Sequence, residues 1–116
     1  MSADATGSPV RAVHWRGQTV IVEVAGDIDL SVSPAFQHAL LKLLDRRPLR
    51  IVINLAAVPY MDSSGVASLV KLLARVRKSG LSMCLTGLTE RVRSVFEITR
   101  LDSVFDIFGT ETEALR

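Results

Sequence analysis

The chain has 116 residues, of which 48% are hydrophobic and 22% charged, with a formal net charge of +2. This length is typical of one domain, and the apolar content excludes a disordered chain. The small positive charge is too low to indicate nucleic-acid binding by itself, the single cysteine excludes an intramolecular disulfide or a cysteine metal cluster, and no apolar run reaches the roughly 18 residues of a membrane span.

The first part of the chain predicts a tail followed by a hairpin. Residues 1–9 are small and polar and lack the basic-then-apolar order of a signal peptide. We therefore expect a flexible N-terminal tail over residues 1–9, a domain over residues 10–116 and a cytoplasmic protein. Residues 10–15 and 19–25 have the pattern of two short strands joined by a tight turn, after which Gly26-Asp27-Ile28-Asp29 interrupts the pattern.

The rest of the chain alternates between helical and strand patterns. Ser33-Pro34 is typical of a helix start, and Pro48 disfavours continuation of that helix. The elements expected next are a strand at 49–55, a helix at about 64–78, a strand at 81–86, a helix capped by Thr89, a short strand within 101–108 and a last turn at 111–116. This order predicts an α/β fold: one domain with a central mixed sheet of four to five strands and helices packed against it.

Two serines lie where the buried strand at 49–55 meets the next helix. One interpretation of Asp62-Ser63-Ser64-Gly65 is helix capping, in which Ser63 or Ser64 accepts hydrogen bonds from backbone N–H groups and Gly65 allows close packing. The other is a phosphorylation site. A phosphate adds about −1.5 to −2 charges, which would repel Asp62 and release a partner that fits the neutral surface.

An enzyme is the competing interpretation of this junction. A strand–serine–helix turn is similar to a nucleophile elbow, but the Gly-x-Ser-x-Gly sequence is absent, and His14 and His38 fall in surface positions of the hairpin and first helix. The aspartates at 27, 29 and 62 have no spacing that specifies a metal site, and the basic second helix lacks the interleaved aromatics of a nucleic-acid platform. We expect no enzyme activity, cofactor or metal, and no direct nucleic-acid partner.

Four segments together resemble the STAS domain family, and within it the bacterial anti-sigma-factor antagonists. They are Gly26-Asp27-Ile28-Asp29, residues 53–65, residues 81–87 and residues 92–101. The resemblance spans about residues 10–110, and Asp62-Ser63-Ser64-Gly65 is its most specific part. The chain departs from the family pattern at Asp27, where glutamate is commoner, and at Pro59, which stiffens the loop before the serines.

The resemblance implies a non-catalytic regulator. Unphosphorylated, it would bind a switch-kinase anti-sigma factor and so free a sigma factor. The kinase would use ATP to phosphorylate Ser63, which lowers the affinity, and a serine phosphatase would restore the active form. The resemblance also implies a partner-binding surface around the phosphoacceptor, made by Asp29, Tyr60, Asp62, Ser64 and Gly65.

A scaffold or adaptor subunit of a stressosome-like or other signalling complex is the alternative within the same family. The two readings differ in assembly. A scaffold predicts a stable high-order complex, whereas an antagonist predicts a monomer or weak dimer that binds a kinase and does not associate with a membrane.

Overall fold

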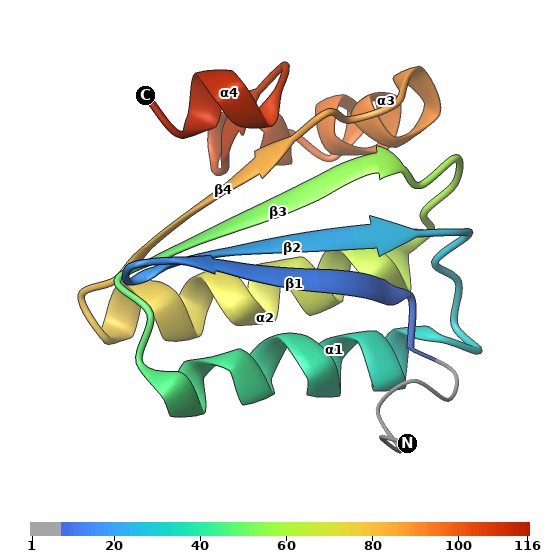
Figure 1. Cartoon of the computed structure of the whole chain (residues 1–116). Coiled ribbons are helices and arrows are strands. Elements are labelled where there is room, and N and C mark those ends of the chain that lie inside the picture. The colour runs from blue at the N-terminus through green and yellow to red at the C-terminus, as the bar shows by residue number, and fades with distance from the viewer. Residues whose placement is uncertain (1–7) are drawn as a thin grey trace.

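A five-stranded mixed sheet forms the centre of the computed structural model, which describes residues 8–116 (Figure 1). Its strands, in spatial order, are β1 (Val10–Arg16), β2 (Thr19–Ala25), β3 (Arg50–Ala57), β4 (Ser82–Thr86) and β5 (Asp106–Phe108). β1 and β2 are antiparallel, and every later pair is parallel. The predicted α/β fold with a mixed sheet is confirmed. The predicted tail lies outside the described residues, apart from Ser8 and Pro9.

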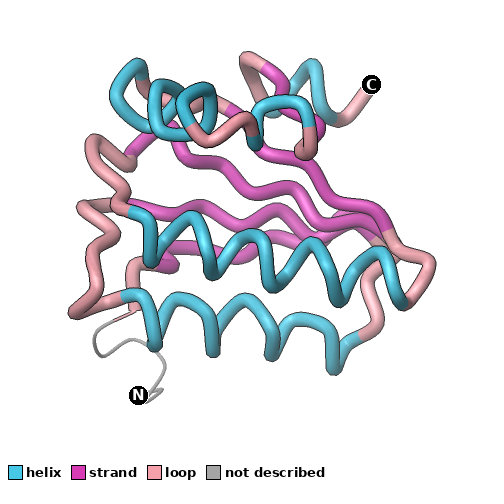
Figure 2. The backbone as a smooth tube through the Cα atoms, turned by 180° about the vertical axis from the view of Figure 1, so that it is seen from behind, coloured by secondary structure: helices cyan, strands magenta, loops and turns pink. Residues whose placement is uncertain are grey.

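Three helices connect the parallel strands, and a fourth follows the last strand. They are α1 (Ser33–Lys42), α2 (Ser63–Lys78), α3 (Glu90–Ile98) and α4 (Glu111–Ala114), with short 3₁₀ turns η2 (Leu43–Arg46) and η3 (Leu101–Ser103). Figure 2 shows α1 and α2 side by side across one face of the sheet, whereas Ala114 of α4 packs with side chains of the opposite face. Right-handed crossovers between neighbouring parallel strands place their helices on one face, which explains this layering.

The alternation of side chains along β2, β3 and β4 separates two apolar clusters. Val22, Ile53 and Leu85 belong to the larger one, which also contains the buried residues of α1, α2 and α3. On the opposite face Val52 and Cys84 pack with Ile21 and with Ala114 of α4. Strands buried on both faces have nearly continuous apolar sequences, which is why Leu49 to Leu55 shows so few polar residues.

Two predicted helix caps are wrong in detail. α1 begins at Ser33, but Val32 is its cap position, and the Ser33 hydroxyl makes only a 3.5 Å contact with the Leu30 carbonyl. The backbone N–H of Ser33 instead donates to the Asp29 carbonyl at 2.9 Å. At the start of α3 the Thr89 hydroxyl does not cap the helix, because it donates to the Val58 carbonyl at 2.9 Å. At α3 a tertiary hydrogen bond therefore replaces side-chain capping, whereas at α1 the bond to Asp29 is a local backbone turn.

Candidate functional site

Two loops that are distant in sequence meet at the carboxyl edge of the sheet. After β3 the chain forms a parallel bridge between Met61 and Ile28, the residue inside the Gly-Asp-Ile-Asp segment. The Ile28 N–H donates to the Tyr60 carbonyl at 3.0 Å, and the Asp62 N–H donates to the Ile28 carbonyl at 3.0 Å. These bonds position Asp29 beside the start of α2.

Asp62 caps α2, rather than either serine. Its backbone is extended, and its carboxylate accepts from the backbone N–H groups of Ser64 at 2.9 Å and Gly65 at 3.4 Å. The Ser64 hydroxyl also donates to Asp62, at 2.5 Å. This hydroxyl bond is the main reason that the pKa of Asp62 is lowered from its usual value. The capping interpretation therefore holds for the motif, but the aspartate is the residue that accepts from the backbone N–H groups, and the serine hydroxyl donates to it.

Ser63 is the exposed member of the serine pair. It is the first residue of α2, and within the described residues its hydroxyl makes no hydrogen bond. Ser64 is only partly exposed, and its hydroxyl is engaged by Asp62. A phosphoryl donor that approaches from solvent would therefore meet a free hydroxyl oxygen at Ser63, whereas the hydroxyl of Ser64 is already hydrogen-bonded to Asp62.

Gly65 permits the close approach of the two loops. A Cβ at this position would lie 2.6 Å from Met61 Cγ and 2.8 Å from Ile28 Cγ2, both shorter than real side chains tolerate. Met61 and Ile28 are buried, so neither side chain can move into solvent. The glycine is thus a packing requirement of the bridge that holds the site together.

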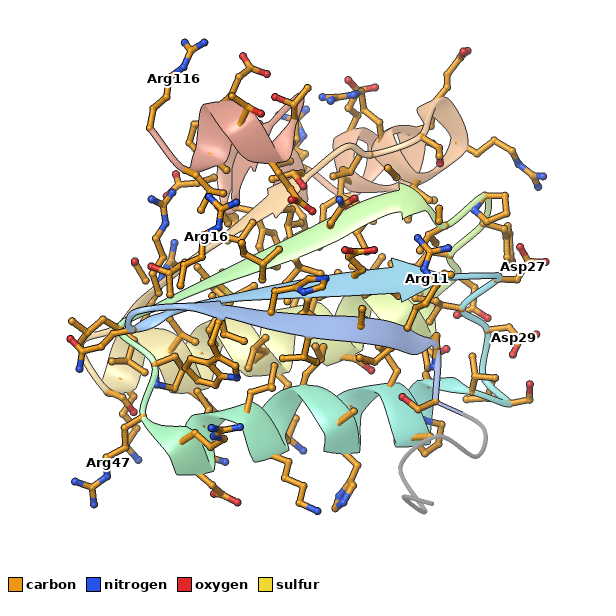
Figure 3. The ribbon with its side chains drawn as sticks, viewed as in Figure 1. Arg11, Arg16, Asp27, Asp29, Arg47 and Arg116 are labelled. Atoms are coloured by element: carbon orange, nitrogen blue, oxygen red, sulfur yellow. The ribbon has the colours of Figure 1, made fainter. Side chains whose placement is uncertain are left out.

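The surface next to Ser63 is acidic. The Ser31 hydroxyl and N–H donate to Asp29 at 2.6 and 2.9 Å, which lowers the pKa of Asp29, while the charge of Asp62 acts in the opposite direction. Asp27 is exposed in the same loop, and Figure 3 shows Asp27 and Asp29 at one end of the domain, with Arg11 at the same end and Arg16 and Arg47 at the opposite one. The two carboxylates nearest to Ser63 in the sequence motif and the Asp29 loop therefore lie close enough to interact before any modification.

Three residues of this surface were missed by sequence reasoning. Leu30, in the Asp29 loop, is 72% exposed, and Ser31 shapes the Asp29 turn. Arg91, from the first turn of α3, lies 5.3 Å over the ring of Tyr60. The serine two residues after an aspartate was a usable turn signal, whereas the Arg91–Tyr60 contact depends on a packing between distant elements that no local pattern contains.

The two histidines do not approach the serines. His14 pairs with Glu23 across β1 and β2 at 2.9 Å, and His38 is exposed on α1. Within residues 8–116 there is no group of three or more histidine, cysteine, aspartate or glutamate side chains placed to hold a metal ion. In the same range no helix combines the length and apolarity that crossing a bilayer requires.

Comparison with known proteins shows similarity to one family. A family profile described as "STAS domain" matches residues 11–114. The chain is 38% identical over 87 residues to the anti-sigma-B factor antagonist of Bacillus subtilis, which covers 74% of this chain and 78% of that protein. A solved anti-sigma factor antagonist from Mycobacterium paratuberculosis is 26% identical with a TM-score of 0.83, covering 90% of this chain and 88% of that one.

The same fold occurs in the anti-sigma factor antagonist SpoIIAA. Its structure in the unphosphorylated form has a TM-score of 0.77 at 21% identity, covering 90% of this chain and 91% of that chain. A structure of the Bacillus protein in the phosphorylated form has a TM-score of 0.70 at 20% identity, covering 90% and 95%. At this level of identity the likeness shows the shared fold.

Proposed function

Because this chain belongs to the STAS domain family, we propose that it is an anti-sigma-factor antagonist whose partner surface surrounds Ser63. The observation that carries the proposal is the free, exposed Ser63 hydroxyl at the start of α2, beside the Asp29 loop. The relative from Bacillus subtilis has the name of such an antagonist, and the Asp62-Ser63-Ser64-Gly65 motif supports the same role.

The partner in this proposal is an anti-sigma factor that is also a serine kinase. Leu30 supplies an exposed apolar contact, and Asp29, Asp62 and Tyr60 supply polar groups around it. Binding would compete with the sigma factor for the anti-sigma factor and so release the sigma factor in the cytoplasm. The domain contributes a surface and a phosphoacceptor, and no catalytic group of its own.

Phosphorylation would reverse the binding. The terminal phosphoryl group of ATP would pass to Ser63 Oγ, with ADP as the leaving group and the hydroxyl proton removed by a base of the kinase. Helix N-termini ordinarily stabilise phosphate through free N–H groups. Here Asp62 already accepts from the N–H groups of Ser64 and Gly65, so the new dianion would lie beside a carboxylate that occupies two of these donors. A serine phosphatase would restore the neutral surface.

Phosphorylation by the candidate kinases of the source genome tests the proposal. Intact mass after incubation with ATP should increase by one phosphate, and peptide mapping should place it on Ser63. Ser63→Ala should take no phosphate and bind the kinase constitutively, while Ser63→Glu should bind weakly. Ser64→Ala is the matched control and should still be phosphorylated, because its hydroxyl is not the free one.

Two results would contradict the proposal. Phosphate on Ser64 in place of Ser63 would refute the argument from hydroxyl occupancy. No modification by any candidate kinase, together with a stable high-order assembly in sedimentation, would favour the scaffold or adaptor function over the antagonist, for which we expect a monomer or weak dimer.

A further inference from the structure

Three connecting segments meet at the amino ends of the parallel strands, away from the phosphoacceptor site. Figure 1 shows them at one end of the domain: the β1–β2 turn (residues 16–18), the segment before β3 (residues 46–50) and the segment after α2 (residues 77–81). The Leu49 N–H donates to the Gln18 carbonyl at 2.8 Å, and the Ser82 N–H donates to the Leu49 carbonyl at 3.1 Å. The three segments therefore form one continuous surface, the basic edge.

The basic edge carries cations without acidic residues among them. Its three segments contain Arg16, Arg46, Arg47, Arg50, Arg77 and Lys78 and no aspartate or glutamate, although Asp45 directly precedes the second segment. Three of these cations already contact the fold: Arg46 lies over the Trp15 ring, Arg50 approaches the Cys84 sulfur, and Arg77 donates to the Val104 carbonyl. The other three carry the unpaired charge.

Arg16, Arg47 and Lys78 come from one segment each. All three are exposed, and none forms an ion pair or a side-chain hydrogen bond with another described residue. Figure 3 shows Arg16 and Arg47 at the end of the domain away from Asp27 and Asp29. Their charges are therefore not neutralised within the domain and can attract an anionic surface.

The backbone at Arg47 would suit glycine better than arginine. Its φ is 52°, in the left-handed region where a Cβ is unfavourable, and its N–H donates to the Leu44 carbonyl at 3.0 Å. The arginine side chain makes no described contact that would offset this strain. A strained residue whose side chain does nothing for the fold points to a use outside it.

Leu49 distinguishes between possible anionic partners. It lies between Arg47 and Arg50 in the sequence and is 56% exposed, although its N–H and carbonyl are both held by neighbouring segments. Leucine offers a nucleic acid neither a hydrogen bond nor the aromatic stacking that single strands use. At a bilayer surface a leucine can enter the acyl boundary while the guanidinium groups around it contact lipid phosphates.

We propose that the basic edge binds the surface of a bilayer that contains anionic lipids. Leu49 enters the acyl boundary, and Arg16, Arg47 and Lys78 contact lipid phosphates. The family resemblance predicted no membrane association, and the proposal departs from that prediction because the cations are concentrated at one edge. The 16 residues of α2 keep Ser63 roughly 20 Å from Lys78, so a bound domain would still expose the phosphoacceptor. The inference therefore goes beyond the proposed function and does not depend on it.

Co-sedimentation of the full chain with large unilamellar vesicles tests the proposal. At low salt, vesicles of equal parts phosphatidylglycerol and phosphatidylcholine should bind at least about tenfold more tightly than vesicles of phosphatidylcholine alone, and high salt should remove the difference. Arg47→Glu and Leu49→Ser should each weaken binding about tenfold. Two matched controls should leave it nearly unchanged: Arg11→Glu, the same charge change at the opposite end, and Ile98→Ser, at an 82% exposed position of α3.

Arg47→Gly separates binding from folding. Because glycine fits the positive φ at this position, the variant should unfold at the same or a higher urea concentration than the natural chain. It should nevertheless bind the mixed vesicles several-fold more weakly, since one cation of the basic edge is lost. Unchanged vesicle binding by a folded Arg47→Gly chain would contradict the proposal.

Three other results would overturn it. Equal binding to the two kinds of vesicle, or binding to neither, would remove the anionic bilayer as the partner. An equal loss from Arg11→Glu would mean that net charge governs binding and not this edge. Duplex DNA or polyglutamate that binds as tightly as the mixed vesicles, and that Leu49→Ser leaves unaffected, would assign the basic edge to a soluble polyanion.

Discussion

Gly65→Ala separates helix propensity from tertiary packing at the phosphoacceptor site. Alanine is favoured over glycine within a helix by about 0.8–1 kcal/mol, so the helix alone predicts a more stable protein. The new Cβ would, however, lie 2.6 Å from Met61 Cγ and 2.8 Å from Ile28 Cγ2. Inserting a methyl group into a packed core costs about 1–3 kcal/mol. Gly65 is in the first turn of α2, where the propensity gain is smallest, so the packing cost should exceed it.

We therefore expect Gly65→Ala to lower the free energy of unfolding by about 1–2 kcal/mol, measured by urea denaturation with circular dichroism. Met61→Ala supplies the matched background, because it removes the closer of the two atoms. Adding Gly65→Ala to Met61→Ala should cost less than adding it to the natural chain, a coupling of about 1 kcal/mol. If Gly65→Ala instead stabilises the protein by about 1 kcal/mol, the two loops are not packed against each other as described, and the reasoning for the whole site is refuted.

Three further predictions concern individual side chains. Asp62→Ala should destabilise the domain by about 1 kcal/mol through the lost cap, and Asp62→Asn by much less. Because the pKa of Asp62 is lowered on folding, the stability that its ionised form contributes is complete above the pKa of the unfolded chain and is lost as the pH falls through the pKa of the folded protein. The difference in stability between wild type and Asp62→Asn should therefore shrink in acid, and a difference that widens would contradict this argument. Asn54 donates to Glu111 at 2.5 Å and accepts from the Ala56 N–H at 2.9 Å, so Asn54→Ala should cost about 1–3 kcal/mol in thermal or urea unfolding, and an unchanged midpoint would mean that α4 does not depend on this residue. Burial raises the pKa of the Cys84 thiol, so we expect the thiol to react with a maleimide only after unfolding. Rapid labelling of the native protein would show that α4 moves away from the sheet face on which Cys84 lies.

The order of strands and helices could be predicted from the sequence because it depends on local periodicity. The apolar run before Ser63 and the helical stripe after it are sufficient to place the motif at a strand-to-helix junction. The STAS family could be identified from the same segments, and the family profile and related proteins confirm it. Element ends were less predictable: the strand predicted at 49–55 extends from Arg50 to Ala57, since sheet hydrogen bonds with β2 determine where it stops.

The roles of the motif residues were decided by tertiary structure. The sequence placed Asp62, Ser63 and Ser64 at the helix start, but any of the three could have capped it, and only the observed bonds leave Ser63 free. The basic edge and the Arg91–Tyr60 contact likewise join segments far apart along the chain. A local pattern determines on which side of its own helix or strand a residue lies. Which other element packs against that side depends on the order of the strands in the sheet, and that order is a property of the whole core.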